Sequence, residues 1–388
     1  MERKITYLDH AATTYVDPIV VKAMDPYFTD KFYNPSSLYT PARELASMVS
    51  DARKTVAKWI NARNDTEIIF TGSGSEGDNT AIFGIAFANR HKGRHIITSP
   101  IEHPAVLETV EGMERFGFEH TIVPVDKSGI LDLDELRKAI RPDTVLITVM
   151  FANNEIGSIQ PVAEIGRIAR EKGIFFHTDA VQAAGSLPID VQEMNIDSLT
   201  IAAHKFYGPK GVGALYIRDG VPFERFMLGG HQERGRRAGT HNNAGIAGLA
   251  AALDLACSKM EENNKKIIYL REKLVKGIME NIPDVIYNGH PEKRLPNNTN
   301  FCFKFIESEA ILLHLDMLGI CASSGSACSS GSEDPSHVLA AIGLTPDIAR
   351  GSIRMTLGRE NTEEEIDFVI ERMKKVIENL RMMSPLVN

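Results

Sequence analysis

The sequence predicts an α/β protein with a mostly parallel sheet covered on both faces, joined to a second, smaller α+β domain. Between residues 66 and 220, short apolar runs such as TEIIFTG, RHIITSP and GIFFHTDA alternate with helical stretches, as is typical of a parallel sheet. The last third instead has long helical stretches around one strand-like run, LPNNTNFCFKF. A length of 388 residues, 43% of them hydrophobic, suits a globular chain of two or three domains.

Helix signals place the elements of the last third. A helical stretch is expected over roughly residues 244–282, and another helix begins near Ser308. Asp334 followed by Pro335 has the form of an N-cap with proline at the first helical position. Thr362 and Glu365 have the spacing of a capping box. The helix that they open has one apolar stripe, made of Ile366, Val369, Ile370, Met373, Val376, Ile377 and Leu380.

Composition and charge argue against several classes of function. A formal net charge of -8 disfavours a broad nucleic-acid surface, because duplex binding needs a basic face to neutralise phosphates. The N-terminal MERKITYLDHAATT lacks the apolar core of a secretory signal, and no run approaches the roughly 18 apolar residues of a membrane span. We therefore expect a cytoplasmic protein without nucleic-acid or membrane partners. The four cysteines form no C-x-x-C pair, which disfavours a disulfide framework and a closed zinc site.

A glycine motif raises the question of a dinucleotide. Gly72, Gly74 and Gly77 in TGSGSEG spell G-x-G-x-x-G between a strand and a helix, which is the order that a dinucleotide-binding turn requires. That motif also needs an acidic residue about 20 positions on, and Glu102 is only approximately in place. The dehydrogenase interpretation therefore depends on the glycines alone.

The same turn suits a phosphate of any cofactor. Backbone N–H groups at a helix N-terminus, with the hydroxyls of Ser73 and Ser75 nearby, form a ready anion site. An ordinary helix start, with Ser73 and Glu76 as a capping box, explains this stretch equally well. Other parts of the chain must decide between the two.

Lys205 and Asp179 favour a cofactor phosphate site over an ordinary helix start. Lys205 lies in LTIAAHKFYGPKGVG, after a strand and before a glycine-rich loop, and Asp179 ends the strand GIFFHTDA. Both should therefore reach the carboxyl edge of the sheet, where α/β proteins bind ligands. A buried carboxylate there needs a cationic partner, which a protonated pyridine nitrogen supplies, and a lysine opposite it can form a Schiff base. Together with a phosphate site, these residues indicate pyridoxal 5'-phosphate (PLP).

A series of segments carries a family resemblance. They are YLDHAATT, NPSS, the Gly-Ser loop, IEHPAV, ANNEIG, HTDAVQ, AAHKFYGPKG, RRAGT, SSGSACSSGS and SIRMTLGR, from about residue 5 to 360. In this order and at about this spacing they resemble the NifS/IscS-type cysteine desulfurases of the class V aminotransferase family. The resemblance implies a fold-type I PLP-dependent transferase that works as a homodimer and converts L-cysteine to L-alanine and an enzyme-bound persulfide.

The resemblance also implies a domain division. Residues 16–261 would form the large PLP-binding domain with a seven-stranded, mostly parallel sheet. Residues 1–15 and 262–388 would form the small α+β domain that carries the catalytic-cysteine loop.

Roles around the cofactor follow from the resemblance, residue by residue. It implies that Lys205 is the Schiff-base lysine, that Asp179 holds the pyridinium nitrogen and that His103, in IEHPAV, stacks on the ring. The other implied contacts are Gln182 with the ring oxygen, Asn154 with cofactor or substrate, Gly74, Ser75 and His204 with the phosphate, Thr240 with the phosphate in the other subunit, and Arg354 with the substrate carboxylate.

Some positions depart from the family pattern. Ser75 stands where a threonine is usual, which keeps the hydroxyl. Ala202 stands where a serine is common, two positions before His204, and the missing phosphate hydrogen bond should weaken PLP retention by about 1 kcal/mol. His10 occupies a position that varies in the family and is assigned no role.

Cys328, within SSGSACSSGS, has almost nothing apolar beside it. Alone it would be an incidental thiol in a Ser/Gly connector, but the resemblance makes it the nucleophile that receives the sulfur. Cys257, Cys302 and Cys321 are better explained as packing residues. The implied acceptor is an iron–sulfur scaffold protein of the IscU/NifU type or another sulfur acceptor. No metal is expected in the isolated enzyme, and whether Cys328 ligates a cluster in a scaffold complex is left open.

Rival functions remain on the sequence alone. An aminotransferase or lyase of the same fold would need Lys205 and Asp179 but not Cys328. A non-catalytic sulfur-delivery partner would keep the fold in order to bind a scaffold protein. The dehydrogenase ranks last, because nothing beyond the glycine motif favours it.

Overall fold

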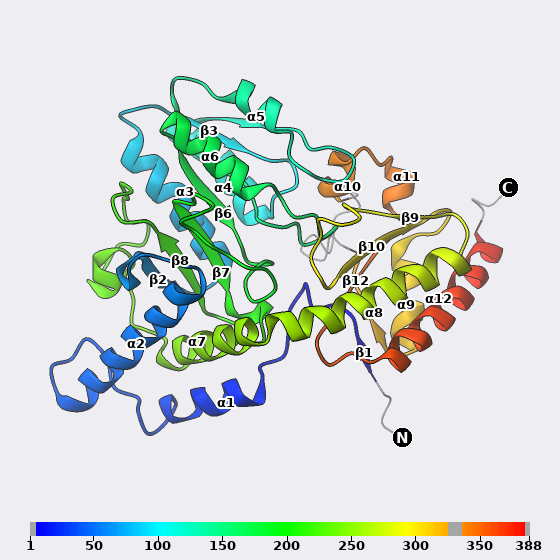
Figure 1. Cartoon of the computed structure of the whole chain (residues 1–388), viewed down its shortest axis with the longest axis horizontal. Helices are drawn as coiled ribbons and strands as arrows, with labels where there is room; N and C mark the ends of the chain where they lie inside the picture. Colours follow the sequence, from blue (N-terminus) through cyan, green and yellow to red (C-terminus); the bar gives the residue numbers. More distant parts are fainter. Residues whose placement is uncertain (1–4, 325–335, 385–388) are drawn as a thin grey trace.

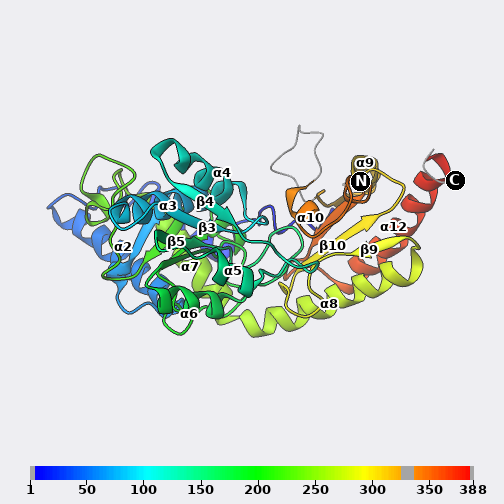
Figure 2. The same cartoon turned by 90° about the horizontal axis from the view of Figure 1, so that it is seen from above.

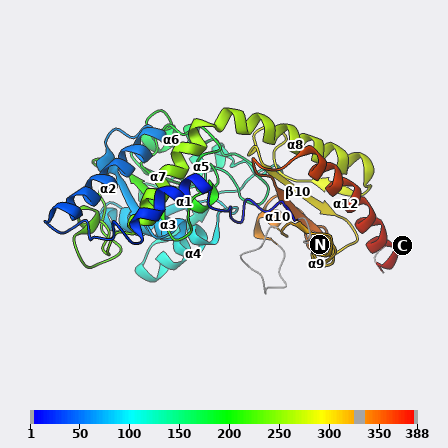
Figure 3. The ribbon, with the colours of Figure 1, turned by 90° about the horizontal axis from the view of Figure 1, so that it is seen from below.

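The chain has a large and a small part that lie side by side. The computed structural model describes residues 5–324 and 336–384. Figure 1 shows the large part in blue to green and the small part in yellow to red, apart from the blue N-terminal strand, which lies beside the small part. Helix α8 (Met260–Asn281) leads from the large part and runs along the small one, as the views from above and below also show (Figures 2 and 3).

A seven-stranded sheet is the centre of the large part. Its strand order is β2-β8-β7-β6-β5-β3-β4; β8 is antiparallel to both of its neighbours and the other pairs are parallel. The strands are β2 (Ile68–Thr71), β3 (His95–Thr98), β4 (Glu119–Ile122), β5 (Thr144–Thr148), β6 (Phe175–Asp179), β7 (Ser198–Ala202) and β8 (Gly213–Ile217). The prediction of a mostly parallel sheet is confirmed.

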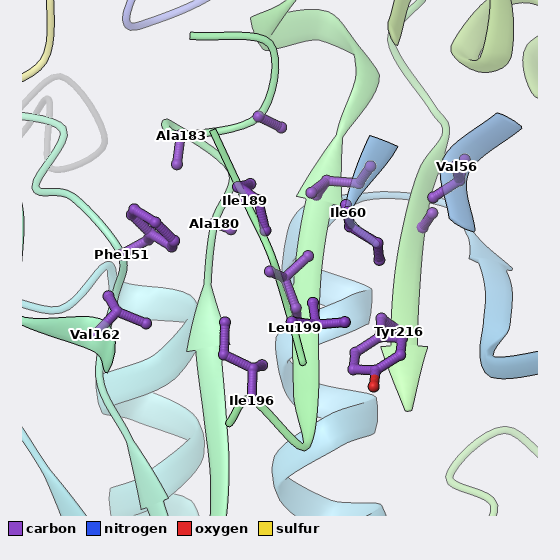
Figure 4. Packing of buried hydrophobic residues seen from close by; sticks show 14 of the residues in the cluster. Val56, Ile60, Phe151, Val162, Ala180, Ala183, Ile189, Ile196, Leu199 and Tyr216 are labelled. Carbon is purple, nitrogen blue, oxygen red and sulfur yellow. The ribbon is translucent and has the colours of Figure 1, made fainter. Parts of the chain in front are cut away.

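Helices cover both faces of this sheet, so that alternate side chains of a strand enter different cores. On β2, Ile68 and Phe70 belong to one core and Ile69 to the other. Figure 4 shows part of the first core, including Leu199 of β7 and Tyr216 of β8. The first core is covered by α1 (Pro18–Met24), α2 (Thr40–Trp59), α5 (Leu133–Ala139), α6 (Val162–Lys172) and α7 (Asn243–Ser258), and the second by α3 (Gly74–Asn89) and α4 (Pro104–Gly112).

The small part is built on a three-stranded antiparallel sheet. Strand β10 (Asn298–Phe303) lies between β9 (Val285–Tyr287) and β12 (Ser352–Thr356), and β1 (Thr6–Tyr7) pairs in parallel with β11 (Ile320–Cys321). Its core is closed by α8, α9 (Ser308–Met317) and α12 (Glu363–Met383). The short helices are α10 (His337–Ala341), α11 (Pro346–Ala349), η1 (Asp25–Tyr27), η2 (Asp65–Glu67), η3 (Met113–Phe116), η4 (Ala203–Lys205) and η5 (Gln232–Gly235).

Most of the helix boundaries follow the sequence signals. Helix α9 begins at Ser308, and the capping box of α12 is formed, because Thr362 Oγ1 accepts a hydrogen bond from Glu365 N at 3.3 Å. The stretch expected over 244–282 is two helices, since Lys259, between α7 and α8, has φ -109° and ψ 12°. Asp334 and Pro335 lie outside the described residues, and the described helix α10 has Ser336 as its N-cap.

The two parts also share a core. Ile101, Met150 and Ile156 of the large part contact Cys302 and Val338 of the small part. This shared core fixes one part against the other beside the carboxyl ends of β3 and β5. The domain boundaries at residues 16 and 262 stay a prediction. Among the described residues, no helix is both long and apolar enough to cross a membrane.

Removing the aromatic centre of the small core should destabilise the protein. Phe301 is fully buried, and its ring lies 5.1 Å from that of Tyr287 and 6.1 Å from that of Phe303. Phe301→Ala should lower the free energy of unfolding by about 3–5 kcal/mol, measured by urea denaturation. Phe305→Ala, at a 38% exposed position, is the control and should cost less than about 1 kcal/mol. Equal losses in both variants would contradict this account of the core.

Candidate active site

Most of the predicted site residues line one cavity of about 440 Å³. The carboxyl ends of the parallel strands open onto it, and the small part closes its other side through Arg354 of β12. Asp179 ends β6, and Lys205 follows β7 in η4. The predicted residues in the lining are Gly74, Ser75, His103, Asn154, Asp179, Gln182, His204, Lys205 and Arg354. The structure therefore brings together residues that are up to 280 positions apart, from Gly74 to Arg354.

Lys205 faces the N-terminal segment of the chain. Its Nζ donates hydrogen bonds to the backbone oxygens of Ala11 at 2.5 Å and Ala12 at 2.9 Å. Gln182 Nε2 donates to the same Ala11 oxygen at 3.0 Å. Carbonyl oxygens accept hydrogen bonds from an ammonium group but have no formal charge of their own. Lys205 can therefore act as an amine once its ammonium group has lost a proton.

Asp179 is a buried carboxylate that needs a cation. It is 7% exposed, and its Oδ1 accepts a hydrogen bond from Val181 N at 2.9 Å. Burial raises the pKa of Asp179, and the charges of His103 and Lys205 partly oppose that rise. A cationic ligand group placed against it would favour the ionised carboxylate further.

His103 is oriented by the helix that follows it. It is the N-cap of α4, and its Nδ1 accepts a hydrogen bond from Ala105 N at 3.1 Å. A ring nitrogen that accepts carries no proton, so the neutral ring has its proton on Nε2. The imidazole thus lies at the cavity in a fixed orientation, as stacking on a planar ligand requires.

The glycine-rich turn opens helix α3 toward the cavity. Ser73 Oγ accepts from Glu76 N at 3.0 Å, and Glu76 Oε2 accepts from Gly72 N at 2.7 Å instead of closing a capping box. A Cβ on Gly74 would lie 2.9 Å from Val181 Cγ2, so glycine is required for this close approach. The first N–H groups of a helix have no intrahelical acceptor, and here they adjoin a cavity of ligand size.

The dehydrogenase interpretation has no support from Glu102. This residue is 1% exposed, and both of its carboxylate oxygens accept from Met150 N, at 3.0 and 2.9 Å. Burial raises the pKa of Glu102 to about 8. Glu102 thus fastens β5 to the turn after β3 and does not line the cavity where a ribose would lie.

These features fit PLP. The anion site at the start of α3, the buried carboxylate of Asp179 and the amine of Lys205 match the phosphate, the pyridine nitrogen and the aldehyde of that cofactor. His204 adds a neutral donor near the phosphate position, because burial and the neighbouring Lys205 lower its pKa to about 4. Its Nδ1 lies 3.1 Å from Thr13 Oγ1.

Arg354 is held on two sides. It is 3% exposed; its Nη2 donates to Asp9 Oδ1 at 2.9 Å and its Nη1 to the backbone oxygen of Asn154 at 3.1 Å. Its Nε is buried and has no hydrogen-bond partner within the described part of the chain. A carboxylate entering the cavity would find an arginine that still has a free donor.

Thr240 does not line this cavity. It is exposed and borders a separate hollow of about 110 Å³ with Gly72 and Arg237. The loop before it contains two left-handed residues, Glu233 with φ 47° and Arg234 with φ 56°. The role of Thr240 at another subunit stays a prediction.

The strained loop is anchored by one buried carboxylate. Glu233 accepts two hydrogen bonds from Arg53 at 2.5 Å, one from Phe70 N at 3.0 Å and one from His241 at 2.8 Å. Burial alone would raise the pKa of Glu233, but the hydrogen bonds from His241 and Arg53 lower it to about 2. These bonds offset backbone strain of about 1–3 kcal/mol per left-handed residue.

Cys328 lies outside the described residues, but hydrogen bonds hold the described chain on both sides of it near the cavity. Ser323 pairs with Arg354, accepting from its N at 2.7 Å and donating to its O at 3.1 Å. On the other side, Ser336 Oγ donates to Glu155 Oε2 at 2.6 Å and His337 Nε2 lies 2.9 Å from the Glu102 oxygen.

All three other cysteines were predicted to be packing residues. Cys302 belongs to the core shared by the two parts, and Cys257 packs against the first core of the large part. Burial raises the pKa of Cys302 and of Cys257 to about 11, which leaves both thiols protonated at neutral pH. Cys321 is half-buried on β11 and was also expected to pack.

Sequence reasoning missed several residues at or beside the cavity. Ala11 and Ala12 line it, and Asp9 contacts Arg354, which lines it. All three belong to YLDHAATT, and no spacing rule reveals their roles, because the contacts of Ala11 and Ala12 with Lys205 come from backbone oxygens. Asp78 also lines the cavity; burial and the nearby Asp179 raise its pKa well above the ordinary value. Its spacing of four from Gly74 on α3 places both on one helix face, and that was the available signal.

Comparisons with known proteins agree with this geometry. The profile of the aminotransferase class-V family matches residues 6–369. A cysteine desulfurase IscS from Clostridium botulinum (strain Hall) is 53% identical over 385 residues, covering 99% of this chain and 97% of the relative. One from Methanosarcina thermophila is 54% identical over 385 residues, covering 99% and 95%.

Solved structures of NifS-like and related proteins are also similar to this chain. A NifS-like protein superposes with a TM-score of 0.91 at 38% identity, over 97% of this chain and 100% of the other. The structure titled SspA in complex with cysteine has a TM-score of 0.81 at 37% identity, over 92% and 99%.

Acid should remove the stabilisation that Glu233 provides. Its pKa falls from an ordinary 4.5 to about 2 on folding, so its contribution is complete above pH 4.5 and is lost as the pH falls toward 2. Glu233→Gln should lower the free energy of unfolding at neutral pH by on the order of 3 kcal/mol, measured by urea denaturation. The difference between variant and wild type should shrink between pH 4.5 and 2. Glu371→Gln, which removes an exposed ion pair with Lys375, should change nothing measurable. A Glu233 difference that is constant with pH would contradict the assignment.

Proposed function

The chain belongs to the aminotransferase class-V family and, within it, to the cysteine desulfurases, and we propose from this premise that its cavity desulfurates L-cysteine with bound PLP. The protein is a fold-type I enzyme of the NifS/IscS type. The observation that carries the proposal is the convergence of Lys205, Asp179 and Arg354 on one cavity beside an anion site. The glycine motif of a dehydrogenase would not account for this convergence.

The proposed cofactor contacts use groups of known chemistry. Asp179 holds the pyridine nitrogen, His103 stacks on the ring, and Gln182 and Asn154 contact its polar edge. Gly74, Ser75 and His204 hold the phosphate. When bound, PLP supplies an electron sink that withdraws electron density from the Cα of an amino acid.

Arg354 and Lys205 act on the substrate. Arg354 binds the α-carboxylate of L-cysteine through its planar guanidinium, whose Nε has no partner in the described residues of the free protein. Lys205 Nζ, in its unprotonated form, accepts the Cα proton and later returns a proton to the product. The carbonyl oxygens of Ala11 and Ala12 define where this nitrogen lies when no ligand engages it.

Sulfur transfer requires a thiolate, and we assign it to Cys328. The Cys328 thiolate attacks the substrate sulfur, so that an S–S bond forms on the enzyme while the substrate C–S bond breaks. Proton uptake at the former C–S carbon gives L-alanine, and the enzyme keeps the sulfur as a persulfide. The fixed positions of Ser323 and Ser336 beside the cavity support this assignment.

The proposed assembly is a cytoplasmic homodimer that passes sulfur to another protein. Thr240 is exposed and outside the cavity of its own chain, which supports a contribution to the phosphate site of a second subunit. The acceptor is an iron–sulfur scaffold protein of the IscU/NifU type or another sulfur acceptor, as the IscS relatives favour. The domain boundaries at residues 16 and 262 belong to the same proposal.

The decisive experiment measures both products of the reaction. Purified enzyme with PLP and L-cysteine should form alanine and carry an extra sulfur on Cys328, detected by mass spectrometry. Cys328→Ala and Lys205→Ala should each lose at least about 100-fold in alanine formation, because each removes a required step. Cys257→Ala is the matched cysteine control and should retain activity. Alanine formation that persists in Cys328→Ala would exclude the persulfide mechanism and favour a lyase.

Restoring a hydroxyl at position 202 should strengthen cofactor binding. Ala202 lines the cavity, and its Cβ lies 3.5 Å from where a Cβ on Gly74 would be. Ala202→Ser can donate a hydrogen bond to the phosphate and should lower the PLP dissociation constant about fivefold, measured by absorbance during dialysis. Ala202→Val adds bulk without a donor and should show no gain. Equal affinity of the serine variant and the wild type would show that the phosphate does not lie beside residue 202.

A further inference from the structure

Arg354 carries a charge that the protein itself must balance in the absence of substrate. Its side chain is 3% exposed, and guanidinium groups stay protonated at any ordinary pH. A buried charge without a partner is costly, and removing one member of a buried pair is strongly destabilising. The position of this arginine at the cavity therefore requires an anion on the same side, whether or not a ligand is present.

Asp9 is that anion. Its Oδ1 lies 2.9 Å from Arg354 Nη2, and its side chain is 19% exposed. The backbone of Asp9 is fixed by a bridge to Thr356 of β12 and by a hydrogen bond from Tyr7 OH to its oxygen at 3.0 Å. Asp9 and Arg354 thus belong to the same small sheet assembly, and their contact does not depend on how the large part is placed.

The contact opposes the binding of a second carboxylate. Asp9 accepts from Nη2 of the guanidinium, the Asn154 oxygen accepts from Nη1, and Nε is buried without a partner in the described residues. A ligand carboxylate that binds the fork in two places must share or displace Nη2. Either way it meets the charge of Asp9 at short range in a site of low exposure, where like charges repel strongly.

We propose that Asp9 is an internal competitor for the substrate carboxylate at Arg354, and so sets the affinity of the site for amino acids. The inference rests on the proposed role of Arg354 in binding the substrate carboxylate. Asp9 holds the guanidinium in place in the free enzyme, and the ligand carboxylate takes it over as Asp9 turns toward solvent.

The competition weakens the binding of substrate and product alike. L-Cysteine and L-alanine have the same α-carboxylate, so that Asp9 opposes both by the same amount. An interaction that is equal in the substrate, transition-state and product complexes changes affinity without changing the rate of the chemical step. The consequence is quicker release of L-alanine, which frees the cavity while the sulfur is still on the enzyme.

The test compares two ligands that differ in charge at one position. L-Alanine has a carboxylate, and L-alaninamide has a neutral amide in its place. Asp9→Asn keeps the size of the side chain and a hydrogen-bond acceptor for Arg354 but removes the charge. In the PLP-loaded enzyme this variant should bind L-alanine about tenfold more tightly than the wild type, by isothermal titration, and L-alaninamide with unchanged affinity.

Controls separate competition from a structural role. Asp17→Asn removes the charge next to Arg359, an arginine outside the cavity lining, and should leave both ligands unaffected. A structural role of Asp9 would change the affinities for both ligands in parallel or weaken L-alanine, and either result would overturn the proposal. Neither ligand contains sulfur, so a failure of cysteine desulfuration in the wild type would overturn the proposed function and leave this comparison readable.

A measurement on the wild-type enzyme covers the case in which Asp9→Asn does not fold. In a crystal structure with L-alanine, the ligand carboxylate should contact Arg354, and the 2.9 Å contact between Arg354 Nη2 and Asp9 Oδ1 should be broken. Retention of that contact with the ligand carboxylate on the same guanidinium would refute competition.

Discussion

A charged group that a protein buries must be matched by another charge or by hydrogen-bond donors or acceptors. This electrostatic requirement links the parts of the structure. Arg354 lies beside Asp9, Glu233 beside Arg53 and His241, and Lys205 against two carbonyl oxygens. Asp179 has one backbone donor and a raised pKa, and it is the member of this set that a cationic ligand would complete. Most charged groups at the site are thus paired within the protein, and the cofactor and substrate supply the remaining partners.

The N-terminal segment, residues 9–13, contacts several of these charged groups. Asp9 contacts Arg354, Ala11 and Ala12 accept from Lys205, and Thr13 contacts His204, so that consecutive residues reach groups from β12 and from the loop after β7. Ala11 N in turn donates to Thr356 Oγ1 at 2.8 Å. Since β1 pairs with β11 in the small part, the segment crosses between both parts at the cavity. Its main-chain groups, more than its side chains, determine where the lysine amine lies.

Much of the fold and the centre of the site could be predicted from the sequence because they depend on local patterns. Apolar runs separated by helical periods predicted the sheet, and a lysine and an aspartate at strand ends predicted a shared cavity. The break at Lys259 could not be predicted, because the helical pattern continues through it and only φ and ψ reveal it. Asp9 was missed for a different reason: its partner is Arg354, and such pairing between the two ends of a chain has no local signal. The proposed role of Thr240 at another subunit comes from the family resemblance alone, because Thr240 is exposed and does not line the cavity of its own chain.

The path of the N-terminal segment has a consequence for biosynthesis. A ribosome releases Asp9, Ala11 and Ala12 among the first residues, but Lys205 much later and Arg354 and Thr356 near the end. Domains generally fold as units during synthesis, and the large sheet can be complete while β12 is still unmade. A prematurely terminated chain that lacks β12 would therefore contain Lys205 but neither Arg354 nor Thr356. These two residues bind Asp9 and Ala11 of the N-terminal segment and so hold that segment beside the lysine. Truncated translation products would thus lack an intact amino-acid site. Only a chain that has been synthesised through β12 can bind the amino acid and release its sulfur.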